Sequence, residues 1–454
     1  MSNVNQLGKY QPYPEYKNSG VDWLGEIPDA WELWKLAHAY DVIGSGTTPP
    51  TNEDKWFGDG VPWVTTGELR ETVVEQTTKN VTFEALNQFS ALKIHPAGSV
   101  VIAMYGATIG RLGVLGIDAT TNQACCVLTQ SQHLYNQYVF YWLYAFRDEI
   151  IKLSSGGGQP NINQEKVASL KITAPDYSHQ KKIVSFLDYE TARIDQLIAK
   201  QQQLIELLKE KRQAVISHAV TKGLNPNAPM KDSGVEWLGQ VPEHWVVAGF
   251  KKFLGKIIDY RGKTPEKTDS GVFLVTARNI KNGVIDYSLS QEFVSESDYE
   301  EIMRRGKPSI GDVLFTTEAP LGEVAQVDRT DIALAQRIIK FCGIANILSN
   351  DYLKMYMQST SFQQGLQTYA TGSTALGIKA DRLGYLRQLL PPIVEQSEIV
   401  EYVKCEQARY SKLISVAEKA ISIMQERRTA LISAAVTGKI DLRGWQPPKC
   451  EVAA

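Results

Sequence analysis

The sequence predicts an α+β protein organised as a pseudo-twofold tandem repeat. Two globular mixed α/β domains are joined by two long helices that pair as an antiparallel coiled coil. Two duplications carry this prediction. Residues 17–31 return at 231–245 with nine of fifteen positions identical, and residues 180–221 return without a gap at 396–437. Because repeats set the architecture of a chain, we infer two long units that share their ends and differ between them.

The first duplicated segment is short and rich in tryptophan. It follows a polar arm, residues 1–16, that contains several Tyr and Pro residues. Trp23, Leu24 and Trp31 offer a large apolar surface that requires a partner to bury it. We therefore expect each copy of this segment to brace the end of a helix.

The blocks between the duplicated ends read as mixed structure of one plan. Apolar, β-branched runs bounded by Gly and Pro predict strands, and four-residue apolar spacing predicts a helix. Pro175 and Pro391 close the two blocks. The expected strands lie at 61–66, 99–105, 271–276 and 311–316, and the expected helices at 135–152 and 352–367.

The second duplicated segment carries a heptad pattern. Sustained seven-residue spacing with charged flanks predicts that the two helices pair with each other; the alternative is that each packs separately on its own domain. Each has about 40 residues, a rod of roughly 60 Å, and ends at Gly223 or Gly438. The apolar spine comprises Leu187, Ile194, Gln201, Leu208 and Val215 with Leu197 and Leu204 interleaved, and Val403, Tyr410, Ala417, Met424 and Leu431 with Leu413 and Ala420 interleaved.

These patterns divide the chain into seven parts. They are an arm with the first scaffold segment (1–31), a first module (32–176), a central helix (177–223), a linker with the repeated scaffold segment (224–245), a second module (246–392), a distal helix (393–440) and a tail (441–454).

Composition restricts the class of protein. A net charge of −2 argues against a protein that coats nucleic acid indiscriminately, but it does not exclude a specific DNA reader with basic residues on one face. There is no run of eighteen apolar residues and no secretory signal, so neither membrane insertion nor export is expected. Cys125 and Cys126, adjacent in an apolar run, indicate buried thiols in a reducing cytoplasm.

No catalytic motif is complete. There is no GxxxxGK[ST] phosphate loop and no Gly-rich turn typical of a methyl-donor site. Asp29, Glu53 and Lys55 imitate a nuclease metal motif, but the repeated copy of the Asp29 segment is followed by no Glu-x-Lys. Six scattered histidines offer no zinc site. We expect a chain that binds rather than catalyses, with no catalytic residue and no metal or cofactor of its own.

The full arrangement resembles a known family. The order is K-x-S-G-V-x-W-L-G-x-[IV]-P-x-x-W, a divergent block, then a helix ending in A-V-I-S-H-A-V-T-K-G or A-L-I-S-A-A-V-T-G-K. Present twice and over essentially the whole chain, it resembles the specificity subunit of type I restriction–modification enzymes, a host-defence system.

The resemblance implies a division of labour. Each module would be a target-recognition domain that reads one half of a bipartite, asymmetric DNA site. The helices would set the spacing and dock two methyltransferase subunits. Those subunits would bind the methyl donor and methylate adenine at N6. Separate motor (restriction) subunits, reached through the methyltransferase, would use ATP and Mg and cleave DNA. This chain would be non-catalytic and cytoplasmic.

Elementary geometry supports the scheme. Readers of two half-sites typically meet one face of DNA about 34 Å apart, and a rigid rod can hold that spacing. If the two modules were identical, the DNA site would be palindromic. Because residues 32–176 and 246–392 differ, we expect the two half-sites to differ as well.

Base readout uses polar side chains on loops that match the donors and acceptors of base edges. We select such residues beside Gly at equivalent loops, although residues of these types also cap turns or remain solvated. The predicted DNA-binding residues are Thr65, Thr66, Tyr105, Thr108, Arg111, Gln159, Asn161 and Asn163 in the first module, and Thr276, Arg278, Asn279, Lys281, Thr317, Ser373, Thr374 and Lys379 in the second.

Two other functions remain open on the sequence. One is an adaptor whose two modules bind proteins, and the other is a self-contained DNA methyltransferase or nuclease. Exchange of residues 246–392 for another block would test the adaptor, because an adaptor has no DNA selectivity to lose. Binding of a methyl donor would identify the enzyme.

Overall fold

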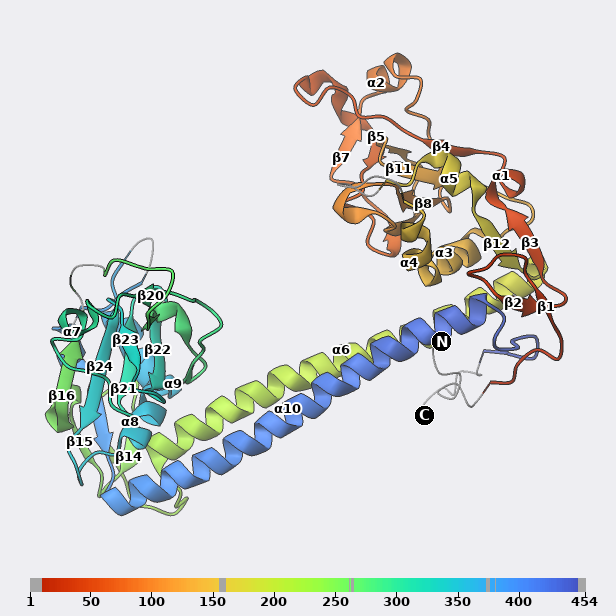
Figure 1. Cartoon of the computed structure of the whole chain (residues 1–454). Coiled ribbons are helices and arrows are strands. Elements are labelled where there is room, and N and C mark those ends of the chain that lie inside the picture. The colour runs from red at the N-terminus through yellow and green to blue at the C-terminus, as the bar shows by residue number, and fades with distance from the viewer. Residues whose placement is uncertain are drawn as a thin grey trace. The chain divides into compact units, whose positions relative to one another are not determined.

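A computed structural model describes residues 10–154, 161–260, 262, 265–372, 376–379 and 381–447. The chain forms two compact units, one comprising Met1–Gln201 with Lys419–Ala454 and the other Gln202–Glu418. Each unit therefore holds one scaffold segment, one module and one half of each long helix (Figure 1). None of the described helices combines the length and the apolar character needed to span a lipid bilayer.

The first module contains a five-stranded and a three-stranded sheet. Neighbours in the larger sheet are antiparallel except β6 and β9, and β5 pairs parallel with β10 and antiparallel with β7. The strands are rich in β-branched residues, and all four residues of β8 are buried. In their order across each sheet they are β4 (Ile43–Ser45), β11 (Cys125–Leu128), β8 (Val100–Ala103), β9 (Leu112–Leu115) and β6 (Thr72–Val74), and β10 (Thr120–Thr121), β5 (Phe57–Val64) and β7 (Lys79–Val81).

The second module repeats most of this topology with different residues, and its larger sheet has four strands, without a counterpart of β6 among the described residues. Its larger sheet is antiparallel, and β17 pairs parallel with β23 and antiparallel with β20. The predicted α+β tandem repeat is therefore confirmed in the two sheets. In the corresponding order the strands are β16 (Leu254–Asp259), β24 (Ile338–Gly343), β21 (Val313–Thr317) and β22 (Leu321–Gln326), and β23 (Ile332–Leu334), β17 (Val272–Val275) and β20 (Phe293–Val294).

Smaller elements complete each module. A two-stranded sheet joins the beginning of each module to its end, β3 with β12 and β15 with β25. The bounds are β3 (Glu32–Lys35), α1 (Leu36–Ala39), η2 (Asp54–Trp56), α2 (Phe83–Gln88), η3 (Gly106–Thr108), α5 (Gln164–Ser169) and β12 (Lys171–Ala174), then β15 (Val246–Gly249), η4 (Phe250–Phe253), η5 (Ala277–Asn279), β18 (Ile280–Lys281), β19 (Val284–Ile285), α7 (Tyr299–Ile302), η6 (Arg382–Tyr385) and β25 (Arg387–Leu390).

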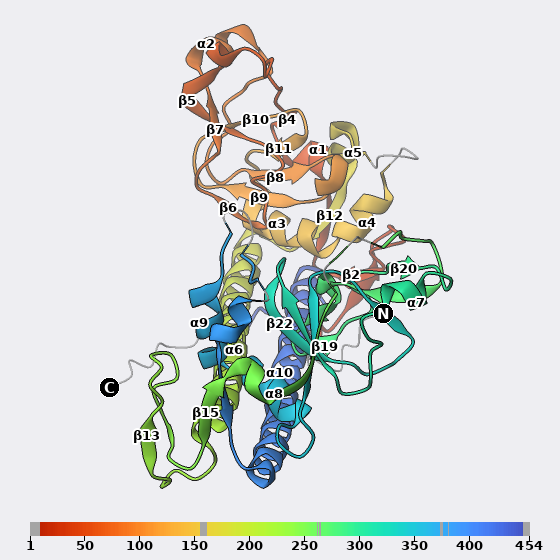
Figure 2. The same cartoon turned by 90° about the vertical axis from the view of Figure 1, so that its left-hand side faces the viewer.

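The predicted helices at 135–152 and 352–367 are each two helices. The first divides into α3 (Asn136–Ala145), which packs against β8 and β9, and α4 (Arg147–Lys152) (Figure 2). The second divides into α8 (Asn350–Met357) and α9 (Thr360–Tyr369). Ser359 has extended backbone angles, and its hydroxyl accepts from the amide of Phe362, which starts a new helix. Periodicity concealed these breaks because both members of each pair cover one core.

Each scaffold segment is a hairpin that packs on the end of a long helix. The hairpins are β1 (Tyr16–Asn18) with β2 (Glu26–Pro28) and β13 (Met230–Asp232) with β14 (Gln240–Pro242). Trp31 and its counterpart Trp245 are buried, whereas Trp23 and Leu24 are half-buried. Gly438 has a φ of +70°, and a Cβ there would lie 2.3 Å from the ring of Pro28, so the contact requires glycine.

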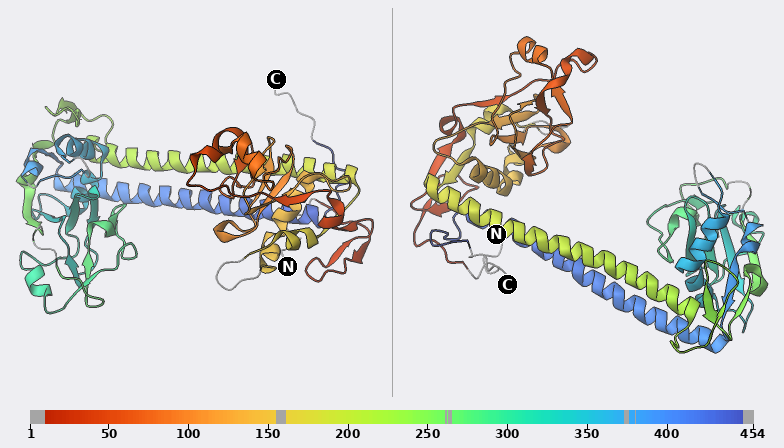
Figure 3. Two further views of the ribbon diagram at one scale, coloured as in Figure 1. Left: turned by 90° about the horizontal axis from the view of Figure 1, so that it is seen from above. Right: turned by 180° about the vertical axis from the view of Figure 1, so that it is seen from behind.

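The long helices are α6 (Tyr177–Lys222) and α10 (Ile393–Val436), and each belongs to the core of both units. In the first unit the start of α6 packs with the end of α10, and Arg428 forms an ion pair with Asp195 at 3.0 Å. In the second unit the end of α6 packs with the start of α10. The predicted antiparallel pairing is thus present within each unit, and Figure 3 shows the two helices from two further sides.

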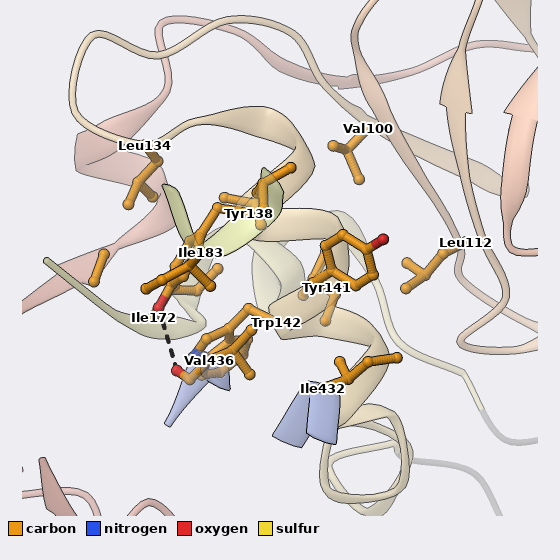
Figure 4. Packing of buried hydrophobic residues seen from close by; sticks show 14 of the residues in the cluster. Val100, Leu112, Leu134, Tyr138, Tyr141, Trp142, Ile172, Ile183, Ile432 and Val436 are labelled. Atoms are coloured by element: carbon orange, nitrogen blue, oxygen red, sulfur yellow. Dashed lines mark hydrogen bonds between the residues drawn. The ribbon is translucent and has the colours of Figure 1, made fainter. Parts of the chain in front are cut away.

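Tyrosine side chains fix the helix ends to the modules. In the first unit the Tyr138 hydroxyl lies 2.7 Å from the carbonyl oxygen of Thr173. It also lies 3.2 Å from the carbonyl oxygen of Val436, the hydrogen bond drawn in Figure 4. In the second, the Tyr352 hydroxyl donates to the carbonyl of Val220 at 3.0 Å. Both tyrosines are fully buried, so the hydroxyls satisfy carbonyls in the last helical turn that lack intrahelical partners.

The interleaved coiled-coil positions were predicted one residue too early. Leu197 and Leu204 are 44% and 42% exposed, whereas Ile205 is 7% exposed. In α10 Leu413 is 43% exposed and Ile414 is buried. The residues of the seven-residue spine face inward as predicted. The other inward-facing position of each heptad lies four residues after a spine residue, not three residues after it. Adjacent apolar residues on α6 and α10 fit both heptad phases, so the pattern alone did not decide between them.

One buried ion pair distinguishes the second module. Lys340 on β24 and Asp312 before β21 have side chains only 5% and 7% exposed, and they are in direct contact. In the first module, strand register places Val127 and Ser99 at the corresponding positions, since Lys340 pairs with Leu314 as Val127 pairs with Val101. The same fold therefore accommodates either a charged or an uncharged pair here.

Substitution of Ile205 by Ala should lower the free energy of unfolding by about 2–4 kcal/mol, because a buried side chain is removed. Substitution of the adjacent Leu204 by Ala should change it by about 0.5 kcal/mol or less. Urea denaturation followed by circular dichroism compares the two. A larger loss for the Leu204 variant would restore the originally predicted heptad phase.

Lys340→Val should destabilise the second unit by about 3–5 kcal/mol, because it leaves the Asp312 carboxylate buried without its cation. The double variant Asp312→Ser with Lys340→Val, which copies the first module, should recover most of that loss. Thermal unfolding of the three proteins measures the difference. Equal destabilisation by the single and the double variant would show that the charges themselves are not the cause.

Candidate nucleic-acid interface

In the first module, the loop after β5 is fixed by one carboxylate. The amide of Thr65 donates to Glu68 Oε2 at 2.8 Å, its hydroxyl donates to the same oxygen, and the amide of Thr78 donates to Oε1 at 3.3 Å. Burial would raise the pKa of Glu68, but the hydrogen bonds from Thr65 and Thr78 outweigh burial and hold that pKa below its ordinary value. The loop is therefore rigidly braced.

The loop after β17 in the second module has the same brace with a different residue. The amide and the hydroxyl of Thr276 both donate to Asn279 Oδ1 at 2.9 Å. The Asn279 amide donates to the carbonyls of Asp286 and Ser290 at 3.0 and 2.8 Å. Asn279 is completely buried, so our prediction that it contacts DNA is wrong; it positions the loop instead.

A second loop in each module joins the next two strands. Between β8 and β9, Tyr105 precedes η3, the Thr108 hydroxyl lies 3.5 Å from the Tyr105 carbonyl, and the amide of Arg111 donates to Thr108 at 3.0 Å. Thr317 begins the corresponding loop between β21 and β22. Only 2% of Thr317 is exposed, and its hydroxyl donates to the carbonyl of Arg337 at 3.2 Å. The predicted DNA contact by Thr317 is therefore also wrong.

A short connection brings the two loops of each module together. In the first module the amide of Asn122 donates to the carbonyl of Val64 at 3.0 Å, and the amide of Met104 donates to Ala124 at 2.8 Å. In the second, the amide of Ala335 donates to Val275 at 2.9 Å. The amide of Thr317 donates to Arg337 at 2.8 Å. The strand-end loop and the hairpin loop therefore lie at one edge of each module.

A third segment of each module bonds to the hairpin loop at the same edge. Asn161 forms a β-bridge with Tyr105, and the amide of Ile162 donates to Met104 at 2.8 Å. In the second module Gly377 forms a bridge with Glu318, and the amide of Ile378 donates to Thr317 at 2.9 Å. The predicted residues Gln159, Ser373 and Thr374 lie outside the described residues.

The remaining predicted residues differ in their surroundings. Asn163 is exposed, but its side chain caps α5 by accepting from the amide of Lys166 at 2.9 Å. Lys281 lies on the separate hairpin of β18 and β19, which packs along β22. Exposed side chains are those of Asn161, Arg278, Lys281 and Lys379, and half-buried ones are those of Thr65, Thr66, Tyr105, Thr108, Arg111 and Thr276.

Sequence reasoning missed basic residues beside these loops. Arg70 and Lys79 line an open hollow together with Thr65 and Glu68. Arg337 lies in the connection between β23 and β24, with its side chain 48% exposed. Aligning residues 335–337 with residues 122–124 of the first module would have identified Arg337. The sequence gives no sign of a turn there, because residues 335–337 lie within a largely apolar run. Within the described ranges, no three His, Cys, Asp or Glu side chains gather in a way that could hold a metal ion.

Comparisons with known proteins agree on one family. Residues 28–207 match the type I restriction modification DNA specificity domain. The EcoKI specificity subunit of Escherichia coli strain K12 is 22% identical over 399 residues, which cover 84% of this chain and 82% of that protein. The MjaIX specificity subunit of Methanocaldococcus jannaschii is 26% identical, and the match covers 44% of this chain but only 46% of that relative.

Solved structures share the fold. A chain from work on assembly and conformational transition of the type I R-M system superposes with a TM-score of 0.68 at 15% identity, covering 91% of this chain and 99% of its own length. The HsdS subunit of Thermoanaerobacter tengcongensis gives 0.54 at 14% identity, covering 91% and 98%. The repeated scaffold, the two modules of one topology and these matches agree. Residues 28–207 therefore match a type I restriction modification DNA specificity domain, and the chain as a whole is similar to specificity subunits of type I restriction–modification enzymes.

Proposed function

We propose that each module of this chain reads one half of a bipartite, asymmetric DNA site. The observation that carries the proposal is the contrast between backbone and side chains at the loop edge. The loops of the two modules follow the same hydrogen-bonding plan, yet Glu68 and Ala124 in one correspond to Asn279 and Arg337 in the other. A common frame with different side chains suits two readers of different sequences. We propose residues 32–176 and 246–392 as the bounds of the two modules.

The residues proposed to contact DNA are those that remain accessible at these edges. Side chains with both donors and acceptors can match base edges, and basic side chains around them bind phosphate and position the protein. Arg70 and Lys79 fit the phosphate role because they line the hollow beside Thr65. We retain Thr65, Thr66, Tyr105, Thr108, Arg111, Asn161, Asn163, Thr276, Arg278, Lys281 and Lys379, and Gln159, Ser373 and Thr374 remain predictions.

The long helices are proposed to set the spacing of the half-sites and to dock the methyltransferase. Specificity subunits of this family work with DNA and methyltransferase subunits; two copies per chain is our proposal. Apolar side chains are exposed at positions that repeat with the same offset of 216. Leu197 and Leu413 are 44% and 43% exposed, and Leu207 and Ile423 are 56% and 54% exposed. Two equivalent exposed apolar patches favour two equivalent partners.

The chemistry is assigned to the partners. The methyl donor would bind the methyltransferase subunits, and ATP and Mg would bind restriction subunits attached through them. Adenine would be methylated at N6 on a base turned out of the duplex. We place the complex in the cytoplasm. The described Cys125, Cys126, Cys342 and Cys405 are free thiols, which suits a reducing compartment.

Replacement of residues 246–392 by a second copy of residues 32–176 should convert the methylated site into an inverted repeat of the first half-site. The shared topology lets the same β3–β12 closure take the place of β15–β25. Mapping of methylated adenines in DNA treated with the chain plus methyltransferase subunits measures the result. An unchanged bipartite site, or methylation by the purified chain alone, would contradict the proposal.

Substitution of Leu197 by Asp should weaken binding of one methyltransferase subunit by about thirtyfold or more, because a charge enters an apolar contact. Leu413→Asp should affect the other site, and the two together should abolish both. Native mass spectrometry reads the stoichiometry directly, with a fall from two subunits to one for each single variant. Ile310→Asp, at a residue 73% exposed on the second module, is the matched control and should bind two. Retention of both subunits by the double variant would exclude this docking surface.

A further inference from the structure

The connection between β23 and β24 holds Arg337 in an uncommon backbone conformation. Its φ is +78°, in the left-handed region that favours glycine and costs other residues roughly 1–2 kcal/mol. Such conformations persist where the surroundings enforce them, and they cluster at functional sites. An arginine at a position suited to glycine indicates that its side chain is used.

Two hydrogen bonds enforce this conformation. The amide and the hydroxyl of Thr317 both donate to the Arg337 carbonyl, at 2.8 and 3.2 Å. Thr317 itself is held from the other side, because its carbonyl accepts from the amide of Ile378 at 2.9 Å. The backbone of Arg337 is therefore fixed by the hairpin loop and by the third segment at the same edge.

The side chain is also oriented. Arg337 Nε lies 2.7 Å from Glu318 Oε1, and the two side chains are 48% and 45% exposed. Glu318 is itself fixed by its bridge to Gly377, where a Cβ would lie 3.2 Å from the Glu318 Cβ. A half-exposed ion pair contributes little to stability. It does restrict the guanidinium to one direction, which lowers the entropy lost when that group binds.

At the equivalent described positions, the first module has no such pair. Ala124 occupies the position of Arg337, since the amide of Met104 donates to its carbonyl as that of Thr317 donates to Arg337. Tyr105 occupies the position of Glu318, because it forms the bridge to the third segment. The charged pair is therefore specific to the module that reads the second half-site.

We propose that Arg337 reads a guanine in the second half-site and that Glu318 is the positioning residue that presents it. The planar guanidinium matches the O6 and N7 acceptors of guanine in the major groove, which an ammonium group cannot match as a fork. The inference rests on the proposed function, because it assumes that this loop edge meets base edges.

Arg337→Gly is the decisive variant, because glycine suits the backbone and removes only the side chain. With the methyltransferase subunits present, the preference for one G·C pair in the second half-site should fall about tenfold to a hundredfold, and the first half-site should be unchanged. The melting temperature should be unchanged or higher. Methylation of a DNA library randomised over both half-sites measures every position at once.

Three further variants separate the roles. Arg337→Lys should lose most of the preference, and Glu318→Gln, which still accepts a hydrogen bond, should lose a smaller part at the same base pair. Arg329→Ala is the control, because Arg329 has a similar ion pair and 46% exposure but precedes β23; its selectivity should match the parent protein.

An unchanged preference for the G·C pair in the Arg337→Gly protein would overturn the assignment of Arg337. An equal fall in selectivity at every position of both half-sites would overturn it as well. Failure of the proposed function is distinguishable, because the parent protein would then show no bipartite site in the same library.

Discussion

Both units depend on satisfying the carbonyl end of a long helix inside an apolar core. The hydroxyl of Tyr138 meets Val436, and the hydroxyl of Tyr352 meets Val220, in surroundings with almost no exposed surface. An unpaired carbonyl in such a core costs roughly 1–3 kcal/mol. The tryptophans of the scaffold hairpins bury the remaining apolar surface beside these ends. The same helices are attached to the modules by Gln180 and Gln396, whose side chains accept from the amides of Tyr135 and Ser349.

Each unit is completed by a helix segment that belongs to the other repeat. The first unit takes its second helix from residues 419–436, and the second takes the end of α6 from the first repeat. Neither repeat therefore contains a complete core of its own. This arrangement explains why the ends of the repeats are copied so closely. Each copied end must fit a partner supplied by the other copy, whereas the backbone bonds that hold the loop edge of a module lie within that module.

The sequence predicted features that depend on many residues together, such as long helices and repeats. It did not predict whether an individual side chain is buried or exposed. Periodicity over more than 40 residues located α6 and α10, and the duplications led to one topology for two dissimilar modules. By contrast, Leu197 and Ile198 are both apolar, and only packing decides which is exposed. Asn279 and Thr317 have the residue types of DNA contacts, yet they are buried braces, and residue type alone cannot separate a brace from a reader. Arg337 was missed because its turn carries no glycine or proline.

The crossed closure also sets the order in which the protein can complete itself on the ribosome. Synthesis proceeds from the N-terminus, and domains fold as their segments emerge. Tyr138 can bond to Val436 only after a further 298 residues have been synthesised. Tyr352 bonds to Val220, which is synthesised before it. The second unit has all its parts once residue 418 has emerged, but the first lacks residues 419–436. The module that is synthesised first is therefore closed last, and the part of its surface that binds the end of α10 stays uncovered until residues 419–436 have emerged.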